Sequence, residues 1–114
     1  MDYNNIVNIY QGDTYITELF INCGTKVNYV QYIIDDYDMV HLYINKYNFN
    51  ISDVVIEKQY DIDSLNADGN IVIQITADET SELEKVTYFY TIKLERFDGE
   101  YVTTIIPPTL LYIL

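Results

Sequence analysis

The alternation of apolar and polar side chains is clearest between residues 86 and 95, where every second residue belongs to the same face. One face is formed by Val86, Tyr88, Tyr90, Ile92 and Leu94, and the other by Thr87, Phe89, Thr91, Lys93 and Glu95. A period of two is typical of a β-strand with one buried face. The pattern therefore predicts a long strand whose first face points into the core.

A tight turn is predicted after this strand. Asp98-Gly99 favours a two-residue hairpin, because both central residues of a type I′ turn need positive φ. The run 101–106 is then the returning strand, and Pro107-Pro108 is expected to end it, because proline cannot donate to a ladder. The apolar run 109–114 is either a last core strand or an edge strand completed by another chain. We favour the core strand, since an exposed apolar edge promotes aggregation.

Shorter runs of the same character precede the hairpin. They predict strands at 5–10, 14–22, 39–45, 54–60 and 71–75, with 27–34 either a strand or an extended connection. Turns are expected at 11–13 and 22–25, and polar loops at 46–53 and 61–70. Thr76 lies three residues before Glu79, the spacing of a capping box, which predicts a short helix near 78–84. The chain thus predicts one all-β domain over 1–114, an antiparallel β-sandwich of about seven or eight short strands.

Composition narrows the classes of partner. The chain has 114 residues, 49% of them hydrophobic, which is enough for one domain with a sizeable core. Thirteen tyrosines and no tryptophan fit half-buried strands and also suit recognition surfaces, and strand propensity is the favoured explanation. The net charge of −12 argues against nucleic acid and anionic membranes as partners, and is compatible with cation binding.

The cysteine content and the absence of long apolar runs bear on location. The single cysteine, Cys23, can form neither an internal disulfide nor a zinc site. No stretch reaches the length that spans a bilayer, and the N-terminus lacks the basic start and apolar core of a signal peptide. We expect a protein that is made in the cytosol and is not exported by the general pathway.

Candidate sites for chemistry are few. His41, the only histidine, is placed on the strand face opposite Val40 and Leu42, and no nucleophile motif accompanies it, so we expect an exposed strand residue and no catalysis. Two loops carry oxygen ligands that suit Ca²⁺: Asp35, Asp36 and Asp38 in one, and Asn66, Asp68 and Asn70 in the other. Neither follows the EF-hand spacing, and turns prefer Asp and Asn, so a solvated turn is the favoured interpretation of both. No cofactor is expected.

Several segments follow one another in a recognisable order. They are Gln11-Gly12-Asp13-Thr14, Asp38-Met39-Val40, Asp68-Gly69-Asn70-Ile71, Thr76 to Thr80 with Leu83, Tyr88-x-Tyr90-x-Ile92, and Asp98-Gly99 with Thr103-Thr104. In this order the chain resembles, over nearly its whole length, the N-terminal β-sandwich domain of phage upper baseplate proteins and related tail-fibre attachment domains. It departs at Lys85-Val86-Thr87, where the family usually has a glycine, and in stopping at Leu114, where a fibre-forming region usually follows.

The resemblance implies a structural protein without enzymatic activity. It would be a free-standing subunit of a phage virion (baseplate, tail or head fibre), made in the host cytoplasm. The resemblance also implies assembly, as a homo-oligomer or with other virion proteins, through sheet faces and loops. The candidate contact residues are Ile16, Phe20, Phe89 and Thr91.

Two other functions compete with this one. A carbohydrate-binding module, Ca²⁺-dependent if the aspartate loop binds, is the alternative, although the absence of tryptophan counts against it. An enzyme ranks far behind, because no spacing singles out a pair of acidic residues.

Overall fold

The computed structural model describes residues 6–24, 29–46, 54–96, 99 and 101–114, with the backbone alone for 22–24 and 29–31. These residues form strands and two short helical segments, which confirms the all-β class. The strands are β1 (Val7–Ile9), β2 (Tyr15–Leu19), β3 (Asn22–Gly24), β4 (Tyr29–Gln31), β5 (Met39–Lys46), β6 (Val54–Tyr60), β7 (Ile71–Ile75), β8 (Thr87–Arg96) and β9 (Tyr101–Ile113). The helix α1 is Ala77–Ser81, and Ile62–Ser64 is a single 3-10 turn.

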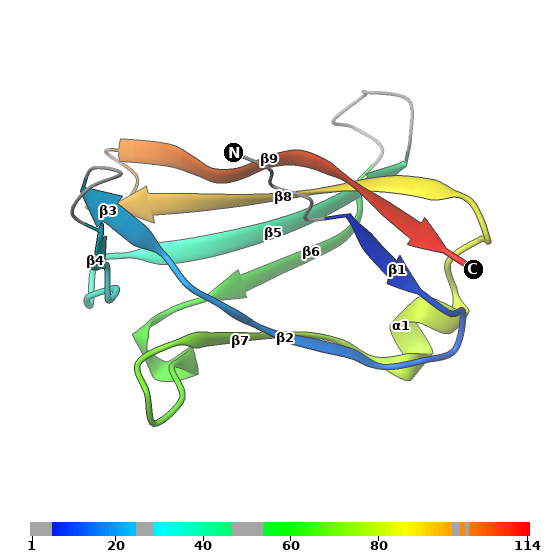
Figure 1. Cartoon of the computed structure of the whole chain (residues 1–114), viewed down its shortest axis with the longest axis horizontal. Helices are drawn as coiled ribbons and strands as arrows, with labels where there is room; N and C mark the ends of the chain where they lie inside the picture. Colours follow the sequence, from blue (N-terminus) through cyan, green and yellow to red (C-terminus); the bar gives the residue numbers. More distant parts are fainter. Residues whose placement is uncertain (1–5, 25–28, 47–53, 97–98, 100) are drawn as a thin grey trace.

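The strands are arranged in two facing layers and a separate hairpin. A five-stranded sheet has the order β1-β9-β8-β5-β6, β2 pairs with β7, and β3 pairs with β4. Figure 1 shows β2 and β7 as a layer facing the curled five-stranded sheet, with α1 at one end of that layer. No helix in the described ranges is long and apolar enough to cross a membrane.

One pair of strands differs from the antiparallel prediction. β1 runs parallel to the end of β9, with Val7 opposite Leu111 and Ile9 opposite Ile113. After β1 the chain turns at Gln11–Asp13 and enters β2 in the other layer, so β1 does not have to form a hairpin with its neighbour. The parallel pair is closed by hydrogen bonds from Leu114 N–H to Ile9 O (2.8 Å) and from Gln11 N–H to Leu114 O (2.9 Å).

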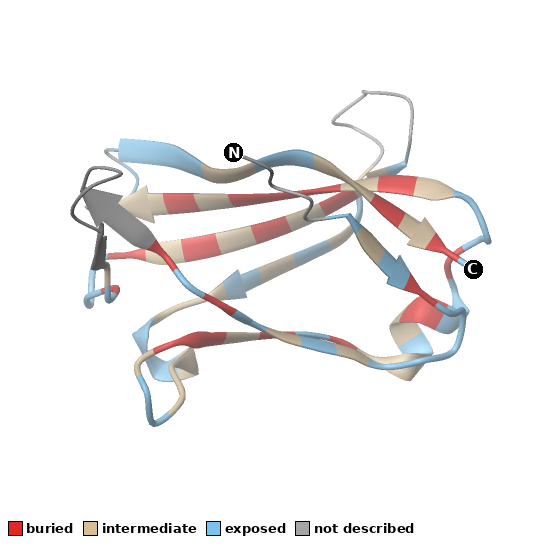
Figure 2. Cartoon of the chain, viewed as in Figure 1, coloured by how far each residue is buried: buried red, intermediate tan, exposed pale blue. Residues whose placement is uncertain are grey.

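The core lies between the two layers and follows the period of two. In β5, β7 and β8 every second side chain is buried, and these side chains belong to one hydrophobic cluster: Val40, Leu42, Ile44, Ile71, Ile73, Ile75, Tyr88, Tyr90, Ile92 and Leu94. Figure 2 shows the same alternation as red bands along β5 and β8. Full burial of one such aliphatic side chain contributes about 1.5–3 kcal/mol. The predicted alternation is confirmed from Tyr88 to Leu94, but the prediction is wrong for Val86, which precedes β8 and is 44% exposed.

The prediction that Pro107-Pro108 ends the last strand is wrong. β9 continues to Ile113, and Leu111 and Ile113 are 2% and 3% exposed, so the final run is a core strand. Ile106 lies opposite Ile92 and Thr109 opposite Tyr90, so the two prolines together face the single residue Thr91. Two residues opposite one is the geometry of a β-bulge, where an N–H can be missing without loss of a ladder hydrogen bond.

Most other boundaries agree with the sequence. The limits of β6 and β7 match the predicted strands, and the capping box between Thr76 and Glu79 is present, although α1 ends at Ser81. The turn expected at 22–25 is wrong for 22–24, which form β3 paired with β4. β8 and β9 pair as the predicted hairpin up to Arg96 and Tyr101, whereas Asp98 and the loop 47–53 lie outside the described residues.

Candidate interaction surface

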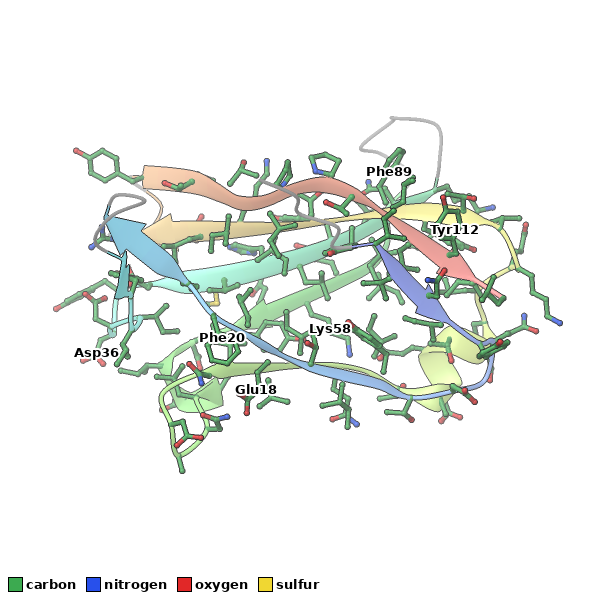
Figure 3. All side chains as sticks on the ribbon, viewed as in Figure 1. Glu18, Phe20, Asp36, Lys58, Phe89 and Tyr112 are labelled. Carbon is green, nitrogen blue, oxygen red and sulfur yellow. The ribbon has the colours of Figure 1, made fainter. Side chains whose placement is uncertain are left out.

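Ile16 and Phe20 lie on the side of β2 that faces away from the core. Leu19 is buried between the layers, whereas Ile16 is 60% and Phe20 56% exposed. Glu18 lies between them on the same side, and Figure 3 shows Glu18 and Phe20 projecting from β2. On the paired strand, Ile16 is opposite Gln74 and Glu18 is opposite Val72. We call Ile16 and Phe20, with Glu18 between them, the β2 surface.

Phe89 and Thr91 lie on the outer face of the five-stranded sheet, and only Phe89 offers surface. Phe89 is partly exposed and lies opposite Leu110 on β9. Tyr112, two residues further along β9, is its diagonal neighbour across the two strands (Figure 3). Thr91 is 8% exposed, so its prediction as a contact residue is wrong. It sits opposite the larger Tyr43 on β5 and beside the bulge of β9, so neighbours in its own sheet cover it.

The aspartate loop before β5 is built around Asp38, which is 3% exposed. Its Oδ2 accepts hydrogen bonds from the Tyr32 hydroxyl and from the Asp35 N–H (3.2 Å), and its Oδ1 lies 3.6 Å from Arg96 Nε. The Arg96 guanidinium carbon also stacks 4.9 Å from the centre of the Tyr32 ring. Burial and the hydrogen bond to Asp38 raise the pKa of Tyr32 to about 12.

The three candidate Ca²⁺ ligands of this loop therefore do not come together in one site, in agreement with the favoured interpretation as a turn. Asp35 Oδ1 accepts from the Tyr37 N–H (2.9 Å), Asp38 points inward to Arg96, and Asp36 is exposed on the surface. Nowhere in the described ranges do three His, Cys, Asp or Glu side chains meet as a metal site would require. The acidic residues of this loop serve as turn and packing groups, since Asp side chains hydrogen-bond nearby backbone.

The second polar loop is also a turn. Asn66 Oδ1 accepts from the N–H groups of Asp68 and Asn70, both at 3.0 Å, and its Nδ2 donates to Glu18 Oε1 (2.8 Å). Asn70 is itself buried. These contacts join the 66–70 turn to β2, which confirms the interpretation of the loop as a turn.

His41 lies on the predicted face of β5 but is not exposed. Its side chain is 12% exposed, its ring stacks on Tyr43 with centroids 5.9 Å apart, and Nε2 lies 3.5 Å from Glu95 Oε2. The expectation of an exposed histidine is wrong because cross-strand and same-face neighbours cover the ring. The sequence could not reveal Glu95 as a neighbour, since the two residues belong to different strands.

An acidic pocket between β6, α1 and the start of β8 was missed by sequence reasoning. It has a volume of about 450 Å³ and is lined by Glu57, Glu79, Glu82, Glu84, Lys46, Val55, Ile56, Leu83 and Tyr88. Burial alone would raise the pKa of Glu79. The Lys58 ammonium at 2.7 Å and the Thr76 N–H outweigh burial, so the pKa is lowered. Lys46 lies 3.6 Å from Glu84. The closely spaced residues Glu79, Glu82 and Glu84 are the part of the pocket that the sequence could have indicated. The lining residues Lys46, Val55, Ile56 and Glu57 come from strands that are distant in the sequence.

The three most exposed of the described tyrosines do not form one platform. Tyr10 follows β1 at one end of the five-stranded sheet, whereas Tyr37 and Tyr101 lie at the other end. A flat aromatic row of the kind that binds sugars is not formed by these three residues. They give the carbohydrate-binding alternative no support.

No protein-family model matches the sequence, and comparison with curated proteins and with solved structures finds no significant similarity.

Proposed function

We propose that this chain is a non-enzymatic structural subunit of a phage virion, in the baseplate, tail or head fibre. It acts by protein–protein assembly with copies of itself or with other virion proteins, after synthesis in the host cytoplasm. We also propose that its two facing layers form a β-sandwich, because the buried faces of β2, β7 and the five-stranded sheet share one hydrophobic cluster.

The β2 surface carries this proposal. Ile16 lies in β2 and Phe20 follows it directly, and both side chains are more than half exposed. The opposite side of the same segment is fixed in the core by Leu19. Exposed apolar side chains gathered on a rigid element are a feature of protein interaction sites. In a chain of net charge −12, such a surface is suited to burial against another protein.

The segments behind the resemblance coincide with structural landmarks, which supports the proposal. Gly12 and Gly69 both have positive φ (+90° and +79°) in the turns before β2 and β7. Thr76 caps α1, and the segment from Tyr88 to Ile92 lies in the long central strand β8. The order that resembles the baseplate domain is thus an order of turns and strand starts in this fold.

The test is incorporation into particles. A tagged chain should be recovered by quantitative peptide mass spectrometry in purified particles of the phage that encodes it, at a fixed ratio to the other structural proteins. The double variant Ile16→Ser, Phe20→Ser should fold but be incorporated at a much lower level. The control Val86→Ser, which changes an exposed apolar residue (44%) before β8, should be incorporated normally. Absence of the wild-type chain from particles would refute the proposal.

A further inference from the structure

Among the described residues, the outer edge of β9 has a strand partner only near its C-terminal end. β9 pairs with β8 from Tyr101 to Tyr112, but β1 covers its other edge only from Leu111 to Ile113. Among the described residues, no strand pairs with that edge along 102–106. An open strand edge presents backbone N–H and C=O groups that a further strand can pair with.

Two of the other edge strands carry charged residues, whereas β1 and β7, like this edge of β9, carry none. β6 carries Glu57 and Lys58, and β2 carries Glu18. On β7, the carbonyl of Gln74 already accepts a hydrogen bond from Lys58. By contrast, residues 101–109 include no charged side chain, Val102 is 59% exposed, and Thr103 and Thr104 are exposed. Charged residues, prolines and bulges all protect strand edges against pairing; this edge has no charged residue, but it has a bulge at Ile105 and prolines at 107–108, so only a short stretch is able to pair.

We propose that residues 102–106 of β9 pair antiparallel with the same residues of a second copy, forming a two-fold dimer in which β6, β5, β8 and β9 of the two copies make one continuous sheet. This deepens the proposed function, on which it rests, by naming a copy of the chain as partner and β9 as the contact. A strand edge is self-complementary under a two-fold axis, because the same groups donate and accept on both sides.

The uncharged run of β9 and the two prolines that follow determine which residues of the two copies can pair. Two chains of charge −12 repel each other, and the uncharged run 101–109 is where they can approach with the least repulsion. Pro107 and Pro108 lack N–H groups, so pairing along this edge stops before them. The paired segment is then centred on Thr104, which lies opposite its own copy across the axis.

The position of Thr104 supplies a sharp variant. Thr104→Glu places two carboxylates directly opposite each other across the two-fold axis, where like charges repel at short range. Gln59→Glu is the matched control, because Gln59 is an exposed residue of the edge strand β6 and the change in charge is the same. Thermal unfolding of both variants checks that each is folded.

The experiment combines sedimentation equilibrium with amide hydrogen exchange on the purified full chain. We expect a monomer–dimer equilibrium that added salt shifts toward the dimer, because salt screens the repulsion between two acidic copies. Amides within 102–106 should exchange more slowly as protein concentration rises. Thr104→Glu should weaken the dimer by at least about tenfold, and Gln59→Glu by less than about twofold.

Three results would overturn the inference: a monomer at every concentration and salt, a dimer that Thr104→Glu leaves unchanged, or a dimer without protection at 102–106. Each would leave the virion proposal standing if the chain is present in purified particles. Absence from particles, with the dimer intact, would refute the virion function alone.

Discussion

At the scale of single residues, the contacts of Asp38 decide what the aspartate loop is. Three aspartates within four positions are compatible with either a Ca²⁺ site or a turn, and the sequence favoured the turn without identifying a reason specific to this chain. The reason is that Asp38 is buried beside Tyr32 and Arg96. Arg96 comes from the end of β8, so its proximity follows from strand register and not from local spacing.

The first prediction concerns this carboxylate. Asp38→Asn removes the negative charge beside Arg96 and weakens the hydrogen bonds from Tyr32 and Asp35, so the free energy of unfolding should fall by about 1–3 kcal/mol. Denaturant unfolding at neutral pH measures the change. Asp36→Asn, on the exposed neighbour, is the control and should change stability by less than about 0.5 kcal/mol. Equal effects of the two variants would contradict this role of Asp38.

Thr80 is a second residue whose role only the fold reveals. It is fully buried, its Oγ1 accepts from the Gly12 N–H (3.1 Å), and its hydroxyl lies 2.7 Å from the Asp13 carbonyl, to which it can donate. These contacts fix α1 against the turn between β1 and β2.

Replacing Thr80 by Val keeps the shape of the side chain but leaves the Gly12 N–H and the Asp13 carbonyl without this partner. Unfolding free energy should fall by about 1–3 kcal/mol, as expected for buried polar groups left unpaired. The control is Ser81→Ala, next along the same helix, whose exposed hydroxyl reaches only the Ala77 carbonyl. A thermal or denaturant melt of Thr80→Val that overlays the wild-type curve would show that the contact contributes nothing.

At the scale of elements, periodicity and capping chemistry were sufficient where the signal is local. β6 and β7 have the predicted limits, and Thr76 and Glu79 form the predicted capping box. Local reasoning failed at Pro107-Pro108, because a bulge opposite Thr91 removes the need for the missing N–H groups. It also failed for the parallel pairing of β1, for the burial of Thr91 and for the low exposure of His41, which depend on strands far apart in sequence. The exposure of Ile16 and Phe20, by contrast, agrees with their place on the outer side of β2.

The contact of β6 with α1 makes a prediction in acid. Because Lys58 and the Thr76 N–H lower the pKa of Glu79 in the folded protein, its carboxylate contributes stability above pH about 4.5, and this contribution is lost as the pH falls through the lowered value. Glu79→Gln should cost about 1 kcal/mol near pH 7, since both groups are partly solvated, and the difference from wild type should shrink toward pH 3. Unfolding curves of both proteins across this range measure it. A difference that stays constant with pH would contradict the assigned ion pair.

At the scale of the whole molecule, two tyrosines in different parts of the fold determine how stability depends on pH in alkaline solution. Burial and the hydrogen bond to Asp38 raise the pKa of Tyr32 to about 12, and burial with the nearby Tyr15 does the same for Tyr90. Folding therefore favours the neutral phenols. The stabilisation is complete below pH 10, the ordinary value, and decreases as the pH rises from 10 toward 12.

The matching prediction is a steep loss of stability in that window. Melting temperature should be nearly constant from pH 8 to about 9.5 and should fall between about 10 and 12, with phenolate absorbance rising as the protein unfolds. Tyr90→Phe should make the fall shallower. A melting temperature that does not change up to pH 12 would contradict the assigned environment of these tyrosines.

The two layers, the apolar β2 surface and the open edge of β9 together describe a molecule suited to assembly. The most direct measurement of the proposed virion role is electron cryomicroscopy of purified particles of the phage that is proposed to encode the chain. We expect repeated copies of the chain in the particle, with Ile16 and Phe20 buried against a neighbouring protein. Particles without the chain, or copies whose β2 surface faces only solvent, would contradict the account.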